Sequence, residues 1–282
     1  MKIKEKKFKN YKNYALITGA ASGMGRLYAH RLAELGYKLI IVDINEEGLT
    51  KVVEETKTIV NSFDDWRENS KKDFDVIAIC QDLSNQDAAE IIYQKTINCQ
   101  VEVLINNAGI MFCQEVCETS ERMLHLIMMV HMYTPLMLCR KFMPLMRERG
   151  NGYVLNVSSL AAWMNWPAIG MYGNTKRFVK DFSRGLRVEF RGTGVSVTNA
   201  YFGAVDTPLI PLKPSLRKLA RALRVMIKAE KAVDIALRAT FRRRKGVMPG
   251  TINRLAKPIL RILPDWFLAW ILEKLRPYLM KV

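Results

Sequence analysis

Short apolar runs alternate with longer stretches of helical periodicity along most of this chain. Runs typical of buried strands cover residues 14–18, 38–42, 75–79, 101–105, 152–157 and 194–199. Helical patterns connect them over about 24–35, 46–60, 85–98, 119–149 and from before Tyr172 to about 191. This order predicts an α/β fold built on a doubly wound parallel sheet.

The pattern divides the chain into three parts. Residues 1–13 form a basic N-terminal arm, residues 14–250 a single α/β domain, and residues 251–282 an amphipathic helical extension. The polar stretch 61–73 is predicted to be a surface insertion between a helix and the third strand. Because no run of 18 apolar residues occurs and residues 1–13 do not resemble a signal peptide, we expect neither a membrane span nor secretion.

Charge is concentrated at the two ends of the chain. The net charge is +17, of which residues 1–14 contribute +5 and residues 212–282 contribute +14, so residues 15–211 carry −2. A basic end is typical of a solvated surface, a nucleic-acid contact or a contact with an anionic membrane. We find no motif that reads nucleic acid, so no nucleic-acid partner is expected.

The five cysteines do not form a metal or disulfide pattern. Their number is odd and their spacing matches no common zinc site, so we expect no metal. Free thiols are typical of a reducing compartment, which predicts a cytoplasmic protein, with peripheral contact at the cytoplasmic membrane face as an alternative. The residues are Cys80, Cys99, Cys113, Cys117 and Cys139.

A glycine-rich turn separates the first strand from the first helix. Thr18 is followed by Gly19, Gly23 and Gly25, and Asp43 ends the second strand 18 residues after Gly25. Glycines at such a turn allow a pyrophosphate to approach the helix N-terminus, and the acid can accept hydrogen bonds from the adenosine ribose. Asp43 could instead cap the next helix.

The position of this acid also bears on the choice of cofactor. A carboxylate at the ribose repels a 2′-phosphate, and no basic residue precedes Gly23 or directly follows Asp43. The sequence therefore favours NAD(H), while NADP(H) stays open.

Tyr172 and Lys176 are spaced by four residues on a predicted helix, so their side chains share a face. A nearby ammonium stabilises a phenolate, which suits the pair to moving a proton on or off an alcohol oxygen. Taken alone, such a pair is more often an ordinary helical surface contact.

Together these motifs resemble the short-chain dehydrogenase/reductase family, over about residues 14–207. The resemblance rests on their order along the chain: 18–25, Asp82-Leu83, 106–109, Ser158-Ser159 and Tyr172 with Lys176. It implies a single Rossmann-type domain with about seven strands in the order 3-2-1-4-5-6-7. It also implies hydride transfer between a nicotinamide cofactor and a carbonyl or alcohol.

The resemblance further implies roles for individual residues. Ser159, thirteen residues before Tyr172, would hold the substrate oxygen, Tyr172 would transfer the proton, and Lys176 would bind the nicotinamide ribose and lower the pKa of Tyr172. The residues expected to contact the cofactor are Gly19, Ser22, Gly23, Met24, Gly25, Asp43, Asp82, Leu83, Asn107, Ala108, Gly109, Tyr172, Lys176, Val205 and Thr207.

The chain departs from the family pattern at two places. His131 stands where a catalytic asparagine is usual, and it could relay a proton through water to Lys176 or only fill the space. Phe202-Gly203 replaces the Pro-Gly usual after the sixth strand. Neither change removes Ser159, Tyr172 or Lys176. Because His131 stands at the position of a catalytic residue, we include it as a fourth catalytic candidate.

The residues expected around the substrate are mostly large and apolar, which favours a lipophilic ketone or secondary alcohol of steroid, ketoacyl or 3-ketosphinganine type. The same residues could equally serve core or subunit packing. They are Ser159, Met111, Phe112, Leu160, Trp163, Met164, Trp166 and the segment 209–226.

The end of the chain predicts a further amphipathic helix. Trp266, Phe267, Trp270 and Ile271 share one side of it, among cations, which suits an interfacial helix on an anionic membrane. A lid over the pocket or a subunit contact, in a homodimer or homotetramer, fits the pattern as well. The competing function is a catalytically weak protein of the same fold that senses a cofactor or binds a membrane.

Overall fold

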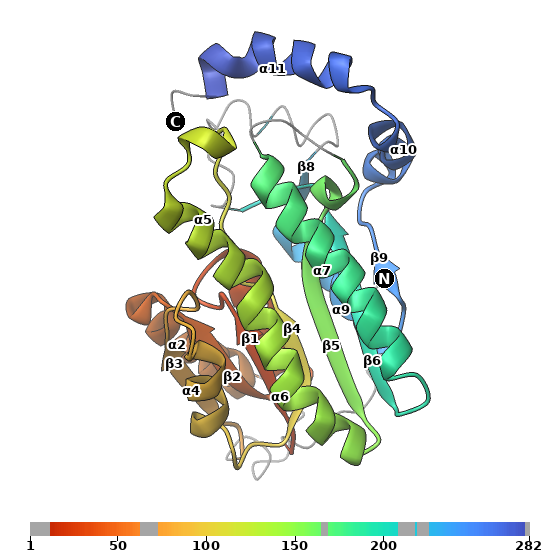
Figure 1. Cartoon of the computed structure of the whole chain (residues 1–282). Coiled ribbons are helices and arrows are strands. Elements are labelled where there is room, and N and C mark those ends of the chain that lie inside the picture. Colours follow the sequence, from red (N-terminus) through yellow and green to blue (C-terminus); the bar gives the residue numbers. More distant parts are fainter. Residues whose placement is uncertain (1–11, 63–72, 165–168, 208–217, 219–225, 280–282) are drawn as a thin grey trace.

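The parallel sheet predicted from the alternation of strands and helices is the centre of the structure, a computed structural model that describes residues 12–62, 73–164, 169–207, 218 and 226–279. Its seven strands follow the order β3-β2-β1-β4-β5-β6-β9 (Figure 1). They are β1 Tyr14–Thr18, β2 Lys38–Asp43, β3 Val76–Cys80, β4 Val101–Asn106, β5 Gly152–Ser159, β6 Val195–Phe202 and β9 Gly246–Val247. The predicted fold class and strand order are therefore confirmed.

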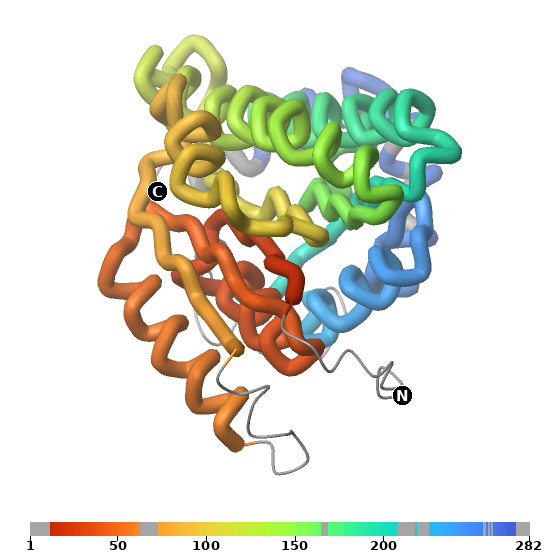
Figure 2. The backbone as a smooth tube through the Cα atoms, turned by 90° about the horizontal axis from the view of Figure 1, so that it is seen from below, coloured from red at the N-terminus to blue at the C-terminus, as the bar shows by residue number. Residues whose placement is uncertain are grey.

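Helices cover both faces of this sheet, as Figures 1 and 2 show from two directions. One face packs against α1 Gly23–Glu34, α2 Glu46–Asn61 and α9 Ala229–Phe241. The other packs against α4 Ala88–Lys95, α6 Thr134–Glu148 and α7 Gly170–Glu189. Because side chains alternate along a strand, Ala15 and Ile17 of β1 enter the first core and Leu16 enters the second.

The long helix predicted over 119–149 is interrupted in the structure. It consists of α5 Glu121–Met128, a π-helical turn at Met129–Tyr133 called η2, and α6. A π-helical turn inserts an extra residue into the helical ladder and is often found at functional sites. The π-helical turn contains His131, which is buried.

Two further differences concern short elements. The helix predicted over 85–98 is formed only by α4, which has 8 residues. The seventh strand, β9, has only 2 residues and pairs with Asn199 and Ala200 of β6. A separate pair, β7 Ala204–Asp206 and β8 Met226–Lys228, forms a small second sheet.

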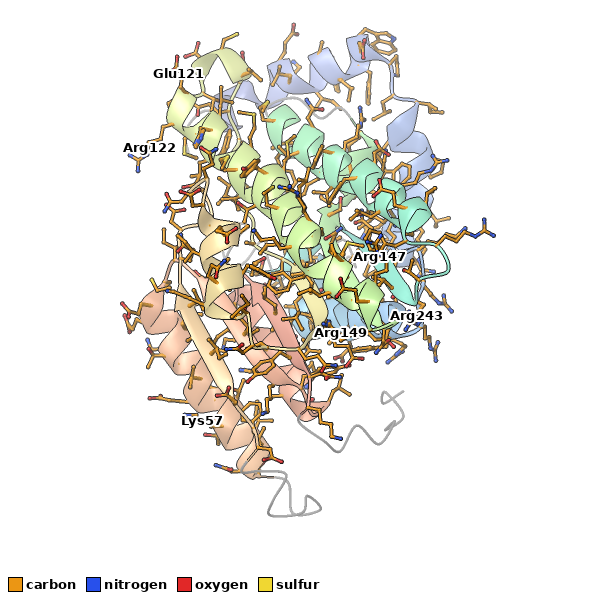
Figure 3. The ribbon with its side chains drawn as sticks, turned by 60° about the horizontal axis from the view of Figure 1, so that its bottom comes forward. Lys57, Glu121, Arg122, Arg147, Arg149 and Arg243 are labelled. Atoms are coloured by element: carbon orange, nitrogen blue, oxygen red, sulfur yellow. The ribbon has the colours of Figure 1, made fainter. Side chains whose placement is uncertain are left out.

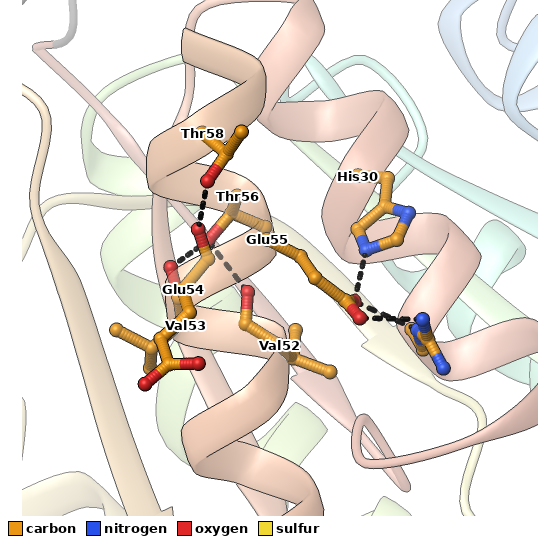
Figure 4. A network of polar contacts seen from close by, with 8 residues as sticks. His30, Val52, Val53, Glu54, Glu55, Thr56 and Thr58 are labelled. Atoms are coloured by element: carbon orange, nitrogen blue, oxygen red, sulfur yellow. Dashed lines mark hydrogen bonds and ion pairs between the residues drawn. The ribbon is translucent and has the colours of Figure 1, made fainter. Parts of the chain in front are cut away.

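A carboxylate on α2 fixes the first two helices against each other (Figure 4). Glu55 accepts a hydrogen bond of 2.8 Å from Arg26 Nε and lies 2.9 Å from His30 Nε2, both on α1. The hydroxyls of Thr56 and Thr58 donate to carbonyls of their own helix, those of Val52 and Glu54. This network holds the start of α1, and with it the glycine turn, beside the end of β2.

The remaining elements lie near the carboxyl ends of the strands. Two short 3₁₀ turns, η1 Val116–Glu118 and η3 Leu160–Trp163, precede α5 and α7. The C-terminal helices are α10 Thr251–Arg261 and α11 Asp265–Leu279. Figure 1 shows α11 across the end of the molecule at which α5 and α7 begin.

Candidate active site

The glycine turn between β1 and α1 packs directly against the segment that follows β4. Gly19 and Gly23 have φ angles of +66° and +51°, which favour glycine. A Cβ at Gly19 would lie 2.8 Å from Ala108 Cα, and a Cβ at Gly25 would lie 1.8 Å from the Gly19 carbonyl oxygen. Glycine is therefore required at positions 19 and 25, because a side chain at either position would overlap the neighbouring backbone.

Hydrogen bonds join the same two segments. The Thr18 hydroxyl accepts from the backbone N–H groups of Asn107 and Ala108, each at 3.1 Å. The Asn107 amide donates to the carbonyls of Thr18 at 2.9 Å and Gly19 at 3.2 Å. The two segments thus form one rigid wall at the carboxyl edge of the sheet.

Asp43 lies at the next strand end and is also fixed by backbone groups. Its carboxylate accepts from Ala21 N at 2.9 Å and from Asn45 N at 3.0 Å. The N-cap of α2 is Asn45, whose side chain accepts from Gly48 N, so the interpretation of Asp43 as the cap of this helix is wrong. Asp43 is instead oriented toward the glycine turn.

These segments enclose a cavity of about 500 Å³, which we call the nucleotide cavity. Eleven of the residues predicted for the cofactor line it: Gly19, Ser22, Gly23, Met24, Asp43, Asp82, Leu83, Asn107, Ala108, Gly109 and Thr207. Gly25 does not line this cavity but packs against the Gly19 carbonyl of the turn. Sequence reasoning missed Ile44, Gln81, Ile110, Leu126 and Val130, which also line the cavity but carry no motif.

A second cavity of about 270 Å³, the catalytic cavity, adjoins the first and shares Met24, Asn107, Gly109 and Thr207 with it. Ser159, Tyr172 and Lys176 all line it, together with Val205. Ser158 also lines this cavity, but its hydroxyl donates to the Lys176 carbonyl at 2.9 Å, whereas the Ser159 side chain is hydrogen-bonded to Tyr172. The structure thus brings the three predicted groups together.

Burial sets the protonation of this cluster. It lowers the pKa of Lys176 to about 8, and the ammonium donates to the Val157 carbonyl at 3.1 Å. Burial also raises the pKa of Tyr172, an effect that the hydrogen bond from Ser159 partly offsets. Lys176, which was predicted to lower the pKa of Tyr172, does not offset this rise; only the Ser159 hydrogen bond acts against it.

His131, on the π-helical turn, is buried and has both ring nitrogens engaged. Nε2 accepts a hydrogen bond from Ile110 N at 3.0 Å, so the proton lies on Nδ1, which is 2.9 Å from the Thr175 hydroxyl. That hydroxyl donates to the Tyr172 carbonyl at 2.9 Å. Burial and the charge of Lys176 hold the pKa of His131 well below 6.5.

This geometry favours a positioning role for His131 over a proton relay. A neutral ring with two engaged nitrogens has no free site for a water-borne proton. The ring instead connects the segment after β4 to α7, the helix that carries Tyr172 and Lys176.

Only part of the predicted substrate group lies at the catalytic cavity. Met111, Leu160 and Met164 line it, as do Ile169, Phe202 and Ala204, which the prediction omitted. Trp163 lies elsewhere: its ring contacts Tyr201 and it lines a separate cavity with α10 and α11. Phe112 is not among the lining residues. Trp166 and most of the segment 209–226 lie outside the described residues.

No site for a metal accompanies these groups in the part of the chain that the structure describes. The described His, Cys, Asp and Glu side chains nowhere gather in threes as metal ligands would. The five cysteines are all unpaired by disulfides.

Comparisons with known proteins agree with this geometry. A family model for short chain dehydrogenases matches residues 13–215. A 17-beta-hydroxysteroid dehydrogenase type 3 of Danio rerio is 30% identical over 215 residues, which cover 74% of this chain and 66% of that protein. A very-long-chain 3-oxoacyl-CoA reductase of Anas platyrhynchos is 30% identical over 223 residues, covering 73% and 64%. The chain spans less than two thirds of the length of either relative.

Solved structures share the fold. A short-chain dehydrogenase from Sphingobium yanoikuyae in complex with NADPH superposes with a TM-score of 0.72 at 21% identity, covering 90% of this chain and 97% of that one.

The buried, neutral state of His131 leads to a prediction about stability. In the unfolded chain a histidine takes up a proton below a pKa of about 6.5, whereas folded His131 does not, so stability falls as the pH falls through this value. Between pH 7.5 and 5.5 this linkage costs about 1.4 kcal/mol. His131→Asn should remove that loss from the pH dependence of the free energy of unfolding in urea.

His125, which is exposed on α5, provides the matched control. His125→Asn should leave the wild-type pH dependence unchanged. An equal fall in stability for wild type and His131→Asn would mean that His131 is protonated in the folded protein.

Proposed function

Because the chain belongs to the short-chain dehydrogenase family, we propose that it is an oxidoreductase that interconverts a lipophilic ketone and a secondary alcohol with a nicotinamide cofactor. One observation carries this proposal: Ser159, Tyr172 and Lys176 line an apolar cavity that adjoins the glycine-lined nucleotide cavity. The two cavities would supply both parts that a hydride transfer needs, a nucleotide site and a proton donor, at one edge of the sheet.

A cavity of about 500 Å³ whose lining includes Gly19 and Gly23 supports a dinucleotide, since glycines let the backbone approach a pyrophosphate closely. Asp43 would hold the adenosine ribose, Lys176 the nicotinamide ribose, and Val205 and Thr207 the carboxamide. A bound nicotinamide supplies or accepts the hydride. Asp82 and Leu83 would flank the adenine.

The protein's own groups handle the proton. In the direction of reduction, the Ser159 hydroxyl orients the substrate oxygen and Tyr172 donates its phenolic proton to it. In oxidation Tyr172 takes the proton back. A lysine with a pKa of about 8 is mostly protonated at neutral pH, so Lys176 supplies positive charge beneath the phenol as it deprotonates.

The walls of the catalytic cavity support a lipophilic substrate. Met111, Leu160, Met164, Ile169 and Phe202 present apolar side chains around the hydroxyl and phenol. The two relatives are named for a steroid and a very-long-chain oxoacyl thioester. We therefore assign this chain a bulky ketone of steroid or 3-oxoacyl type.

NAD(H) is the cofactor that the charges around the ribose support. The Asp43 carboxylate lines the nucleotide cavity, where it would repel a 2′-phosphate. Arg26, the cation nearest the glycine turn in sequence, is held by Glu55 through a 2.8 Å hydrogen bond. It is therefore not available to neutralise such a phosphate.

Tyr172→Phe tests the catalytic assignment. It keeps the ring and removes the hydroxyl, so kcat should fall by at least about a hundredfold, the low end for losing general acid–base catalysis. The affinity for NADH should change little. Turnover is measured by NADH oxidation against a panel of ketosteroids, 3-oxoacyl thioesters and short ketones.

Tyr93→Phe, on α4 and away from both cavities, is the control and should keep wild-type turnover. Wild-type turnover in Tyr172→Phe itself would exclude this chemistry and favour a protein that only senses its cofactor.

Asp43→Ser tests the cofactor preference. Wild type should bind NADH at least tenfold more tightly than NADPH, a difference of about 1.4 kcal/mol, and the variant should narrow this gap. Fluorescence titration of both cofactors gives the two dissociation constants. Asp87→Ser, at an exposed carboxylate before α4, should leave the gap unchanged. Tighter binding of NADPH by wild type would reverse the assignment.

We further propose that the C-terminal helices dock on an anionic membrane surface. In the described part of the chain, no helix combines the length and apolarity that crossing a bilayer requires. Five exposed large apolar side chains nevertheless gather on and between α10 and α11: Ile252, Leu255, Ile262, Trp266 and Trp270. Trp266 and Trp270 are 73% and 52% exposed, whereas Leu268 between them is buried against the protein.

Exposed tryptophans beside cations suit an interfacial helix. Arg254 and Lys274 are exposed on these helices and would face anionic headgroups. A lid folded over the pocket would bury the tryptophans within the chain instead. Docking would let a lipophilic substrate reach Tyr172 without crossing water.

Replacing Trp266 and Trp270 together by serine tests the docking. Burial of one large apolar side chain contributes about 1.5–3 kcal/mol, so vesicle affinity should fall by at least about tenfold. Co-sedimentation with phosphatidylglycerol vesicles measures it. Ile97→Ser with Val116→Ser, also exposed but outside these helices, should bind as wild type does. Wild-type protein that stays in the supernatant at low salt would refute the proposal.

A further inference from the structure

A second concave surface lies at the opposite end of the sheet from the catalytic cavity. It is a cavity of about 770 Å³ lined by five cations, Arg184, Arg187, Arg191, Arg243 and Lys245, and we call it the basic groove. In Figure 3, Arg243 lies at the same end of the molecule as Arg147 and Arg149, away from Lys57 and Arg122. The groove plays no part in the proposed reaction.

The short strand β9 explains why a groove exists here. It pairs only with Asn199 and Ala200, so the first residues of β6, Val195 to Val197, lie at an open edge of the sheet. Two arginines cover this edge. Arg187 donates to the Lys245 carbonyl at 3.0 Å, and Arg243 donates to the Gly194 carbonyl at 2.5 Å.

Several contacts hold the Arg243 side chain in place. It has a φ of +54°, unusual for a residue with a side chain, and its guanidinium lies 4.6 Å from the centre of the Tyr153 ring. It also donates to Asn151 Oδ1 at 2.8 Å. The positions of Arg187 and Arg243 are therefore set before any ligand arrives, which lowers the entropy cost of binding.

Protection of the open edge does not account for the other three cations. Among the described residues, the side chains of Arg184, Arg191 and Lys245 have no hydrogen-bond or ion-pair partner, and none of the residues that line the groove is acidic. Burial lowers the pKa of Arg187, and the like charge of the neighbouring Arg184 adds a smaller effect in the same direction, so these two guanidinium groups crowd each other. Such crowding is unfavourable unless an anion offsets it.

The floor of the groove is apolar. Val188 is 71% exposed between the arginines, and Phe190, Val195 and Val197 line the groove beside it. Arginine forks match phosphate oxygens in a bidentate manner.

We propose that the basic groove binds an anion carrying two or more phosphate groups, either free in solution or in a lipid headgroup. Five cations from two separate segments, the end of α7 and the turn after α9, surround more space than a single phosphate fills. Several phosphates are needed to contact both segments at once. The groove is therefore a binding site separate from the nucleotide cavity.

Isothermal titration calorimetry of the full chain with inorganic tripolyphosphate, at near-physiological ionic strength, tests this site. Binding should be at least about tenfold tighter than that of orthophosphate, because only the longer anion spans both segments. Arg184→Gln with Arg191→Gln should weaken it by at least about tenfold, since charge-assisted hydrogen bonds to phosphate are lost. Because both side chains are exposed and lack partners, thermal unfolding should not change.

Lys57→Gln with Arg122→Gln is the matched control, with the same loss of charge at exposed positions elsewhere (Figure 3). It should bind tripolyphosphate as wild type does. Arg184→Lys with Arg191→Lys keeps the charge but removes the fork, and should give intermediate affinity. The proposal is overturned if the control loses as much affinity for tripolyphosphate, or if orthophosphate binds as tightly as tripolyphosphate. Either result would mean that the anion is attracted only by the overall positive charge.

Vesicles distinguish the two sources of phosphate. Vesicles with a phosphoinositide bisphosphate are compared with phosphatidylserine vesicles of equal charge, using the Trp266→Ser and Trp270→Ser background to remove docking by the C-terminal helices. If the protein binds the phosphoinositide vesicles more tightly, and replacing Arg184 and Arg191 abolishes this preference, the ligand of the groove is a lipid headgroup. Binding of tripolyphosphate alone assigns a soluble ligand. If wild type binds neither, the proposal fails, whether or not the enzyme activity is found.

Discussion

The contact between Thr18 and Asn107 is the interaction on which the rest of the site depends. The Thr18 hydroxyl at the end of β1 accepts hydrogen bonds from two backbone N–H groups of the segment after β4. In the other direction, the Asn107 side-chain amide donates to the carbonyls of Thr18 and Gly19. These bonds fix two neighbouring strand ends in register. The nucleotide cavity, the catalytic cavity and the segment that reaches His131 all share this wall.

Much of this arrangement could be predicted from the sequence because it depends on local chemistry. Glycines at strand-to-helix turns, an acid at a strand end and alternating apolar runs each indicate their structure within a few residues. Since parallel strands end at one edge of a sheet, their terminal residues could also be placed together. Gly19, Asp43, Ser159 and Tyr172 lie as that reasoning expects.

The features that sequence reasoning missed depend on distant contacts. The π-helical turn at His131 is set by bonds to Ile110 and Thr175, residues 21 and 44 positions away. The strand β9 has two residues, too few for any periodic signal. Nothing in the sequence around Trp163 indicates whether its ring lines the substrate cavity or packs against Tyr201, as it does in the structure. The pKa of Tyr172 likewise depends on burial, which composition does not give.

The packing of the C-terminal extension against the sheet has a mechanical consequence. Asn253, in the first turn of α10, occupies the space in which a Cβ of Gly203 would stand, 2.5 Å from two of its side-chain atoms. Gly203 lines the catalytic cavity, so the extension and the cavity wall share a single contact surface without slack. A side chain at position 203 would therefore have to displace Asn253, so glycine at this position lets α10 and the residue that follows β6 lie in direct contact.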